Sequence, residues 1–182
     1  MGCALGELAR AGRDKVTFVV SEPLASFGDW AEQLIAESTG KQGRGIVPVV
    51  GEPLGEPGVY GDDRLFVHAR LAGDDAHEQP LARLAAAGHP VIRLELSDTY
   101  DLGAQLFLWE FAVAVAGYRL GISPFDQPNV ESAKARAREL SNRYAADGGL
   151  PAGDAVQPSG EALAQFLAQA RPGDYIAIQA FV

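Results

Sequence analysis

Short apolar runs alternate along the chain with longer segments in which apolar residues recur every three or four positions. The short runs are rich in β-branched residues and predict strands at residues 16–20, 46–50, 65–71, 91–96 and 175–182. The longer segments predict helices at residues 5–11, 27–38, 80–87, 102–120, 128–146 and 160–170. Strands that alternate with helices are typical of a parallel sheet covered by helices. We therefore expect an α/β fold, a three-layer αβα sandwich around a mainly parallel five-stranded sheet.

Three of these segments carry further information. Pro48 has no N–H to donate to a neighbouring strand, so the run at 46–50 is predicted to lie at a sheet edge or to stop early. The segment at 102–120 is apolar around most of its circumference, which predicts a central, heavily buried helix. Proline suits the first turn of a helix because its missing N–H needs no partner there. Pro128 is therefore predicted to start the helix at 128–146.

The C-terminal part of the chain is set apart by its composition. Residues 147–158 are rich in glycine, proline and small residues, which is typical of a linker. Ser159 follows, and its hydroxyl can cap the last predicted helix. The final predicted strand has no polar tail after it. We expect a main domain at 1–146, a linker at 147–158, and a helix and strand at 159–182 that are truncated from a longer protein.

Charge and cysteine content exclude several classes of function. The 24 acidic and 15 basic residues give a net charge of −9, and the basic residues are scattered, so a nucleic-acid partner is not expected. The single cysteine cannot form a disulfide within the chain, which suits a reducing compartment. No apolar run approaches the roughly 20 residues that cross a membrane. We expect a cytoplasmic protein that binds neither nucleic acid nor membranes.

Four polar residues are candidates for chemistry by their place on predicted helices. Glu37 ends the segment at 27–38, and Gln33 lies one turn earlier on the same face. Gln127 and Lys134 are seven residues apart, which also returns to one helix face. A carboxylate can act as a base, and amide and ammonium groups can bind a polar ligand. On spacing alone, ordinary solvated side chains are the simpler interpretation of all four.

Two motifs resemble signatures of a known family. The decamer FDQPNVESAK at 125–134 closely resembles the phosphoglucose isomerase signature FDQxGVExxK, and AESTGK at 36–41 resembles that family's ESNGK motif. The stretch GEPGVYGDD at 55–63 is similar to the family's GEPGTNGQH. The similarity spans residues 16–144, and its wording is closest to the isomerase part of bacterial transaldolase/phosphoglucose isomerase fusion proteins.

The resemblance implies an activity and roles for the candidate residues. It implies the interconversion of glucose 6-phosphate and fructose 6-phosphate by acid/base proton transfer through an enediol. Glu37 takes the place of the base that moves a proton between C1 and C2. Lys134 takes the place of a lysine that assists ring opening, and Gln33 and Gln127 take the places of substrate-contacting amides. The implied fold is that of a sugar-isomerase (SIS) domain, which is flavodoxin-like or Rossmann-like.

The resemblance also bears on partners and on the location of the site. It implies a phosphorylated sugar as substrate, no cofactor and no metal, and a homodimer of the full-length parent. We expect Glu37 and the loop of Gln127 to meet outside the sheet's edge, where ligand sites of open α/β sheets commonly lie.

The sequence departs from the family pattern at three places. Asn129 replaces the glycine of FDQxGVExxK, and Thr39 replaces the asparagine of ESNGK. Family members donate a ring-opening histidine across the dimer, but Asp63 or Arg64 stands at the matching place here. His68 lies a few residues further on and is kept as a candidate for this acid, although an odd shift along a strand changes the face that a side chain addresses.

The family's phosphate-binding Ser/Thr-rich loop and its Gly-Gly-Arg segment have no counterpart in the sequence. We therefore expect the second of two SIS domains, the C-terminal portion of an isomerase, which holds part of an active site and is inactive or weak alone. The alternative is a non-catalytic, sugar-phosphate-binding regulatory module, but a pure sensor needs no enediol base. A structural or assembly domain is the third possibility.

Overall fold

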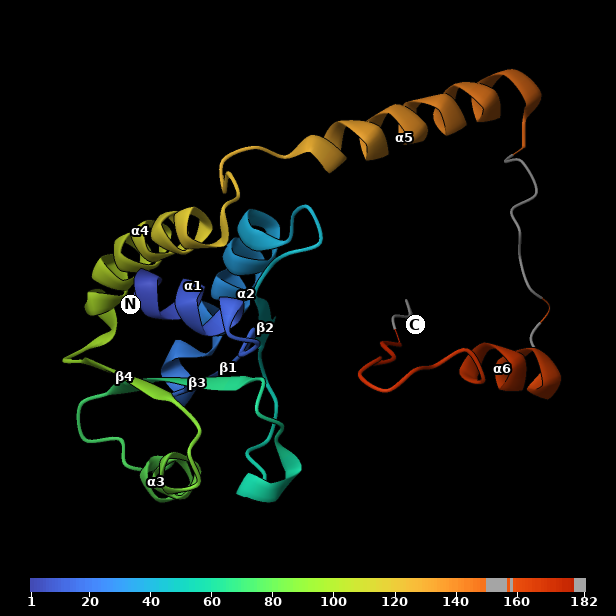
Figure 1. The fold of residues 1–182 in the computed structure, drawn as a ribbon. Coiled ribbons are helices and arrows are strands. Elements are labelled where there is room, and N and C mark those ends of the chain that lie inside the picture. The colour runs from blue at the N-terminus through green and yellow to red at the C-terminus, as the bar shows by residue number, and fades with distance from the viewer. Residues whose placement is uncertain (150–156, 158, 179–182) are drawn as a thin grey trace. The chain divides into compact units, whose positions relative to one another are not determined.

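The computed structural model describes residues 1–149, 157 and 159–178 (Figure 1). The chain divides into two compact units, Met1–Asn129 and Val130–Val182, and each is described by itself. The first unit holds α1 (Gly2–Arg10), β1 (Lys15–Val20), α2 (Ala25–Thr39), β2 (Val47–Val49), β3 (Arg64–Leu71), α3 (Glu78–Ala86), β4 (Val91–Leu96) and α4 (Leu102–Leu120). Two further helices follow, α5 (Pro128–Asp147) and α6 (Gly160–Leu167).

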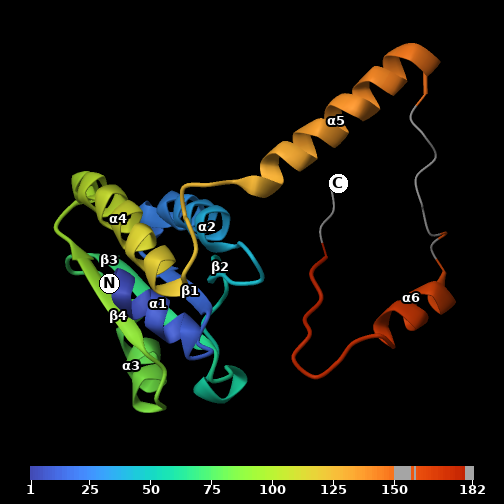
Figure 2. The same ribbon diagram turned by 45° about the horizontal axis from the view of Figure 1, so that its top comes forward.

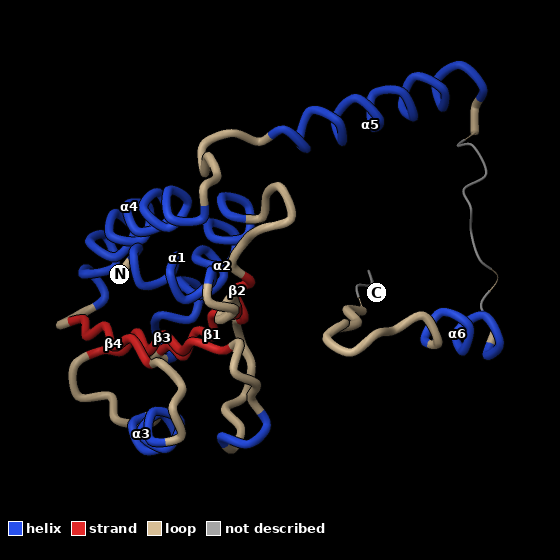
Figure 3. The backbone as a smooth tube through the Cα atoms, in the orientation of Figure 1, coloured by secondary structure: helices blue, strands red, loops and turns tan. Residues whose placement is uncertain are grey.

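The sheet has four parallel strands in the order β2-β1-β3-β4. The short strand β2 lies at an edge, as its proline predicts. Helices α1, α2 and α4 cover one face and α3 covers the other, which gives the expected three-layer α/β sandwich (Figures 1 and 3). The expected fifth strand is wrong for residues 175–178, which form no strand, and residues 179–182 lie outside the described part.

Alternate residues of the central strands fill two separate cores. On β1 and β3, Phe18 and Val67 face α1, α2 and α4, where they pack with Trp109 of α4. Phe66 faces the other way and packs with Leu81 of α3. Strands that are buried on both faces have nearly continuous apolar sequences, which is why both strands could be predicted from the sequence.

Helix α4 has the expected bounds but not the expected burial. Its Trp109 is fully buried, whereas Phe107, Phe111 and Tyr118 are 71%, 63% and 78% exposed. One side of α4 packs against α1 and α2, and the other side is apolar but uncovered by residues of its own unit, Met1–Asn129. An all-round apolar pattern reveals that a helix can be buried, but not how many of its sides are covered.

Glycines bring α1 close to α4, and Figure 2 shows the two helices packed together. A Cβ at Gly2 would clash with the carbonyl oxygen of Ala112, and a Cβ at Gly6 would lie 2.6 Å from Cβ of Arg119. These two positions have no room for a larger side chain. In the C-terminal unit, Ser159 caps α6 as predicted, since its hydroxyl accepts a hydrogen bond from the N–H of Ala162 at 3.0 Å.

None of the helices in the described part is both long and apolar enough to span a membrane.

Candidate active site

Glu37 and Gln127 are in direct contact. Glu37 lies on the last turn of α2, and Gln127 lies just before α5, at the end of the loop that follows α4. The side-chain amide of Gln127 donates a hydrogen bond from Nε2 to Oε1 of Glu37 at 2.6 Å, and both side chains are exposed. The two motifs that the sequence singled out therefore meet in space, although these residues are 90 positions apart.

The contact lies toward the amino ends of the strands. Helix α2 follows β1 and runs back along it, so its last turn lies near the start of β2, where Val47 pairs with Lys15, the first residue of β1. Ligand sites of open α/β sheets commonly lie at the opposite, carboxyl ends. The expectation that Glu37 and Gln127 meet is confirmed. They meet near the amino ends of the strands, however, and not at the carboxyl ends where ligands of such sheets commonly bind.

A tight turn follows Glu37 and carries two cations. Lys41 and Arg44 form an antiparallel bridge, with Gln42 and Gly43 between them at φ of 56° and 71°. Positive φ at both central residues is the signature of a type I′ hairpin turn. Directly paired residues of an antiparallel bridge project their side chains to the same side. We call residues 41–44 the cation hairpin.

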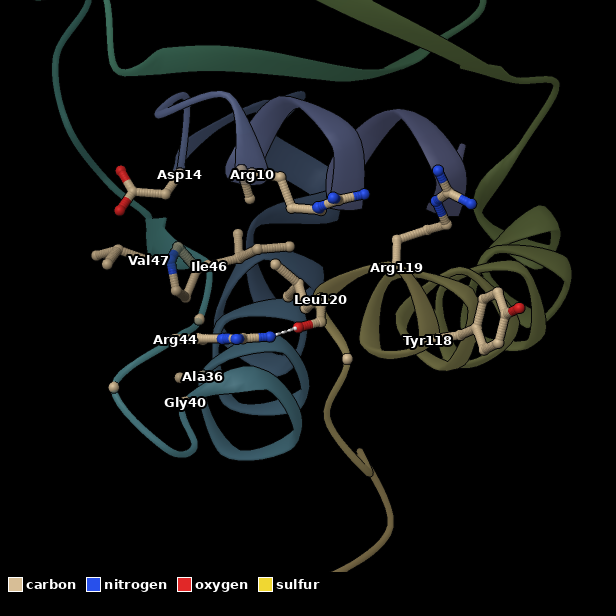
Figure 4. A pocket seen from close by; sticks show the side chains of 15 residues that line it. Arg10, Asp14, Ala36, Gly40, Arg44, Ile46, Val47, Tyr118, Arg119 and Leu120 are labelled. Atoms are coloured by element: carbon tan, nitrogen blue, oxygen red, sulfur yellow. Dashed lines mark hydrogen bonds between the residues drawn. The ribbon is translucent and has the colours of Figure 1, made fainter.

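Both cations of this hairpin bind main-chain oxygens at and beyond the end of α4. The ammonium of Lys41 donates to the carbonyl oxygens of Ser123, at 3.0 Å, and of Asp126. The guanidinium of Arg44 donates from Nη1 to the carbonyl oxygen of Leu120 (Figure 4). These roles are not evident from the sequence, because a lysine and an arginine beside a helix end look like ordinary solvated residues. Gly40, Gly43 and Gly45 indicate a turn after α2, but no local pattern shows what the two cations bind.

Thr39 fastens the end of α2 to the chain after the cation hairpin. Its buried hydroxyl donates to the carbonyl oxygen of Ile35 at 2.8 Å and accepts from the N–H of Ile46 at 2.9 Å. The threonine that replaces the family asparagine thus holds the helix turn that carries Glu37. Its contacts explain why a small hydroxyl residue fits this position.

The other two residues implied by the resemblance are both exposed. Gln33 lies one turn before Glu37 on α2. Lys134 belongs to the second unit and lies on α5, where its Nζ is 3.6 Å from a carboxylate oxygen of Glu131. Their roles stay predictions.

His68 does not share a face with Glu37. It is 1% exposed and lies on the α3 side of β3, whereas α2 packs on the other side of the sheet. Its Nδ1 is 3.5 Å from Oε1 of Glu78 and has no hydrogen-bond partner among the described residues. Burial lowers the pKa of His68, against the opposing effect of Glu78. An acid that serves the substrate of another subunit must be accessible, so the geometry disfavours the hypothesis that His68 opens the sugar ring.

A pocket of about 1060 Å³ opens beside the cation hairpin, between the end of α1, the start of β2 and the end of α4 (Figure 4). Its arginines already have partners, since Arg10 and Arg119 pair with Glu7 and Arg44 binds a carbonyl oxygen. Neither Glu37 nor Gln127 lines it. Within residues 1–149, 157 and 159–178, no three His, Cys, Asp or Glu side chains gather into a group that could hold a metal.

Comparison with known proteins gives one consistent set of relatives. The chain is 31% identical over 169 residues to glucose-6-phosphate isomerase of Symbiobacterium thermophilum, with 72% of this chain and 38% of the relative covered. It is 30% identical over 166 residues to the enzyme of that name from Enterococcus faecalis, with 70% and 37% covered. It is 27% identical over 158 residues to that from Lactobacillus helveticus, with 66% and 35% covered. No family model matches the chain.

The fold has a counterpart among solved structures. A hypothetical protein from Thermus thermophilus superposes with a TM-score of 0.56 at 23% identity, over 76% of this chain and 44% of that one. This likeness supports the fold alone. The chain spans little more than a third of the length of the curated relatives that it matches. Within that span, the sequence is related to the glucose-6-phosphate isomerase family.

Proposed function

We propose that the chain forms the base-bearing part of a glucose-6-phosphate isomerase active site, with Glu37 as the proton-transfer base. The observation that carries this proposal is the hydrogen bond from Gln127 to Glu37, which joins the two motifs on which the family resemblance rests. The relatives supply the class of reaction, because they are named glucose-6-phosphate isomerases.

A carboxylate suits the proton transfer that this reaction needs. In the open-chain aldose, the proton on C2 is acidified by the carbonyl group at C1. Glu37 takes this proton as O1 becomes protonated, and the electron pair left on C2 forms the C1=C2 double bond of an enediol. Return of the proton to C1, with loss of the proton on O2, gives fructose 6-phosphate. Atoms and charges balance without a redox partner.

Gln127 is proposed to orient the base. Its amide engages Oε1 of Glu37, and no other hydrogen bond to this carboxylate is found among the described residues. Oε2 is therefore the oxygen available to the substrate. A neutral amide donor fixes the carboxylate's rotamer without pairing its charge, as an arginine or lysine would.

Gln33 and Lys134 complete the proposed set. Gln33 lies on the face of α2 that carries Glu37 and is proposed to bind a sugar hydroxyl. Lys134 is proposed to assist ring opening. The substrate's phosphate is proposed to bind to a part of the full-length protein beyond the matched third, in a cytoplasmic homodimer. The isolated chain is then inactive or weak.

The test uses the native protein that carries this sequence, purified from its source, beside the 182-residue chain alone. Conversion of glucose 6-phosphate to fructose 6-phosphate is measured for the wild type and for Glu37→Gln. We expect the variant to bind substrate but to lose turnover by about 10³-fold or more, because proton abstraction then has no carboxylate base. Glu32→Gln, an exposed neighbour on the same helix, is the control with unchanged turnover.

Two results would change the assignment. Near-normal turnover by Glu37→Gln would remove Glu37 as the base. Tight binding of glucose 6-phosphate by the wild-type native protein without any turnover would instead support the regulatory module.

A further inference from the structure

We propose that Lys41 and Arg44 are positioning residues, which together hold the loop after α4 so that Gln127 reaches Glu37. The inference that this contact matters for turnover rests on the proposed function. The clamp itself rests on the geometry of the cation hairpin. Neither residue touches the proposed reacting atoms, so neither is called catalytic.

Lys41 is buried, which is unusual for a lysine. A lysine is rarely buried, because removing an ammonium group from water is costly unless hydrogen bonds compensate. Lys41 is only 7% exposed, and it has no carboxylate partner within ion-pair distance among the described residues. The lost hydration of its ammonium group is compensated by hydrogen bonds to the carbonyl oxygens of Ser123 and Asp126. The loop is thus tied to this ammonium, because any conformation that withdraws both oxygens leaves a buried charge unsatisfied.

The tethered oxygens follow one another along the chain toward Gln127. Arg44 binds Leu120, the last residue of α4, and Lys41 binds Ser123 and then Asp126, the residue directly before Gln127. Two side chains from one tight turn therefore restrain three points of a seven-residue stretch. The position of Arg44 at the end of α4 is also favourable because carbonyl groups there carry partial negative charge.

Few other tethers hold the loop beyond Pro124. The N–H of Ile122 donates to the carbonyl oxygen of Gly117, and Pro124 packs over the same glycine. Beyond Pro124, the hydrogen bonds that the structure describes between the loop and the helix layer are those of Lys41 and of Gln127 itself. An exposed amide–carboxylate hydrogen bond is too weak to order a loop, since its energy is small against the entropy lost. The cation hairpin is what remains to set the position of Gln127.

The test measures the contact directly and does not depend on turnover. In the full 182-residue chain, NMR records the side-chain amide of Gln127 and the labelled carboxyl carbon of Glu37. We expect Lys41→Met to shift both signals to the positions seen in single variants that break the contact, Glu37→Gln for the amide and Gln127→Ala for the carboxyl. Amide hydrogen exchange at residues 121–127 should accelerate. Lys15→Met, which removes an ion-paired lysine at the start of β1, is the matched control without these shifts.

A double variant separates positioning from general destabilisation. The carboxyl signal of Lys41→Met/Gln127→Ala should equal that of Gln127→Ala, because the clamp acts through Gln127. In the native protein, Lys41→Met is expected to lower kcat by about 10-fold to 100-fold with little change in KM, the scale expected for a misplaced active-site group. The fall in kcat caused by Lys41→Met should be smaller in the Gln127→Ala background than in the wild type. An equal fall in both backgrounds would show a merely structural effect and overturn the proposal.

The outcomes distinguish this inference from the proposed function. Unchanged Gln127 and Glu37 signals in Lys41→Met overturn the clamp, whatever the enzyme's activity. Shifted signals in a native protein that has no isomerase activity support the clamp and refute the proposed function. If Lys41→Met does not fold, Arg44→Gln carries the same test, because it removes the tether at Leu120 and leaves the buried ammonium in place.

Discussion

Removal of one buried hydroxyl should loosen the end of α2. In Thr39→Val, a methyl group of similar size replaces Oγ1, and the N–H of Ile46 loses its acceptor at 2.9 Å. The carbonyl of Ile35 loses one donor, but it still faces the helical N–H four residues on. Thr39 is fully buried, so water cannot replace the lost acceptor. An unsatisfied buried donor costs about 1–3 kcal/mol, and we expect Thr39→Val to be destabilised by that amount.

Two further variants isolate the hydroxyl from the methyl group. Thr39→Ser keeps both hydrogen bonds and removes one buried methyl, at a cost of about 0.8 kcal/mol. Ser38→Ala is the neighbouring control, and it should stay within about 0.5 kcal/mol of the wild type, as for substitutions away from buried features.

Urea unfolding monitored by tryptophan fluorescence measures these differences. Trp30 and Trp109, the two tryptophans of the chain, both lie in the N-terminal unit. With a slope of about 1–3 kcal/mol per M, a loss of about 2 kcal/mol lowers the midpoint by about 1 M. If Thr39→Val unfolds within about 0.5 kcal/mol of the wild type, or is more stable than Thr39→Ser, the N–H of Ile46 does not depend on Thr39 and the reasoning is refuted.

Two further predictions concern a buried histidine and the contact between α1 and α4. Burial lowers the pKa of His68 in the folded state, so its contribution to stability is full above the unfolded pKa of about 6.5 and is lost as pH falls through that value toward the folded pKa. Urea unfolding is measured at pH values of about 7.5 and about 5.5, on either side of that unfolded pKa. The free energy of unfolding should fall less between the higher and the lower pH in His68→Gln than in the wild type, and equal falls would contradict this account. Gly6→Ala should destabilise the chain, because about 1–3 kcal/mol of overpacking against Arg119 exceeds the gain of up to about 1 kcal/mol in helix propensity. Gly103→Ala on α4 meets no neighbouring atom within 4 Å and should be neutral or stabilising, so a reversed order of thermal midpoints would contradict the close approach of the two helices.

The sequence revealed those parts of the fold that local patterns encode. Central strands that are buried on both sides must be apolar at nearly every position, so β1 and β3 were found to within one residue. The edge position of β2 followed from the missing N–H of Pro48. The exposed side of α4 was not predictable, because Phe107 and Phe111 are as apolar as the buried residues beside them.

The sequence motifs predicted which residues belong to the candidate site, but not the contacts between their side chains. The motifs singled out Glu37 and Gln127, yet no local pattern reveals that residues 90 positions apart share a hydrogen bond. Lys41 escaped notice because its role depends on two carbonyl oxygens more than 80 positions away. Sequence spacing reports on neighbours along a helix or strand, whereas this site joins the end of one helix to a distant loop.

Proton exchange with solvent tests the central claim most directly. The native protein that carries this sequence is incubated with glucose 6-phosphate in D₂O, and NMR follows deuterium at C2 of the sugar. If Glu37 is the base, the wild type and Glu32→Gln incorporate deuterium at C2, and Glu37→Gln loses this exchange by about 10³-fold or more while it still binds the sugar. Exchange by Glu37→Gln at a rate close to that of the wild type would contradict the account.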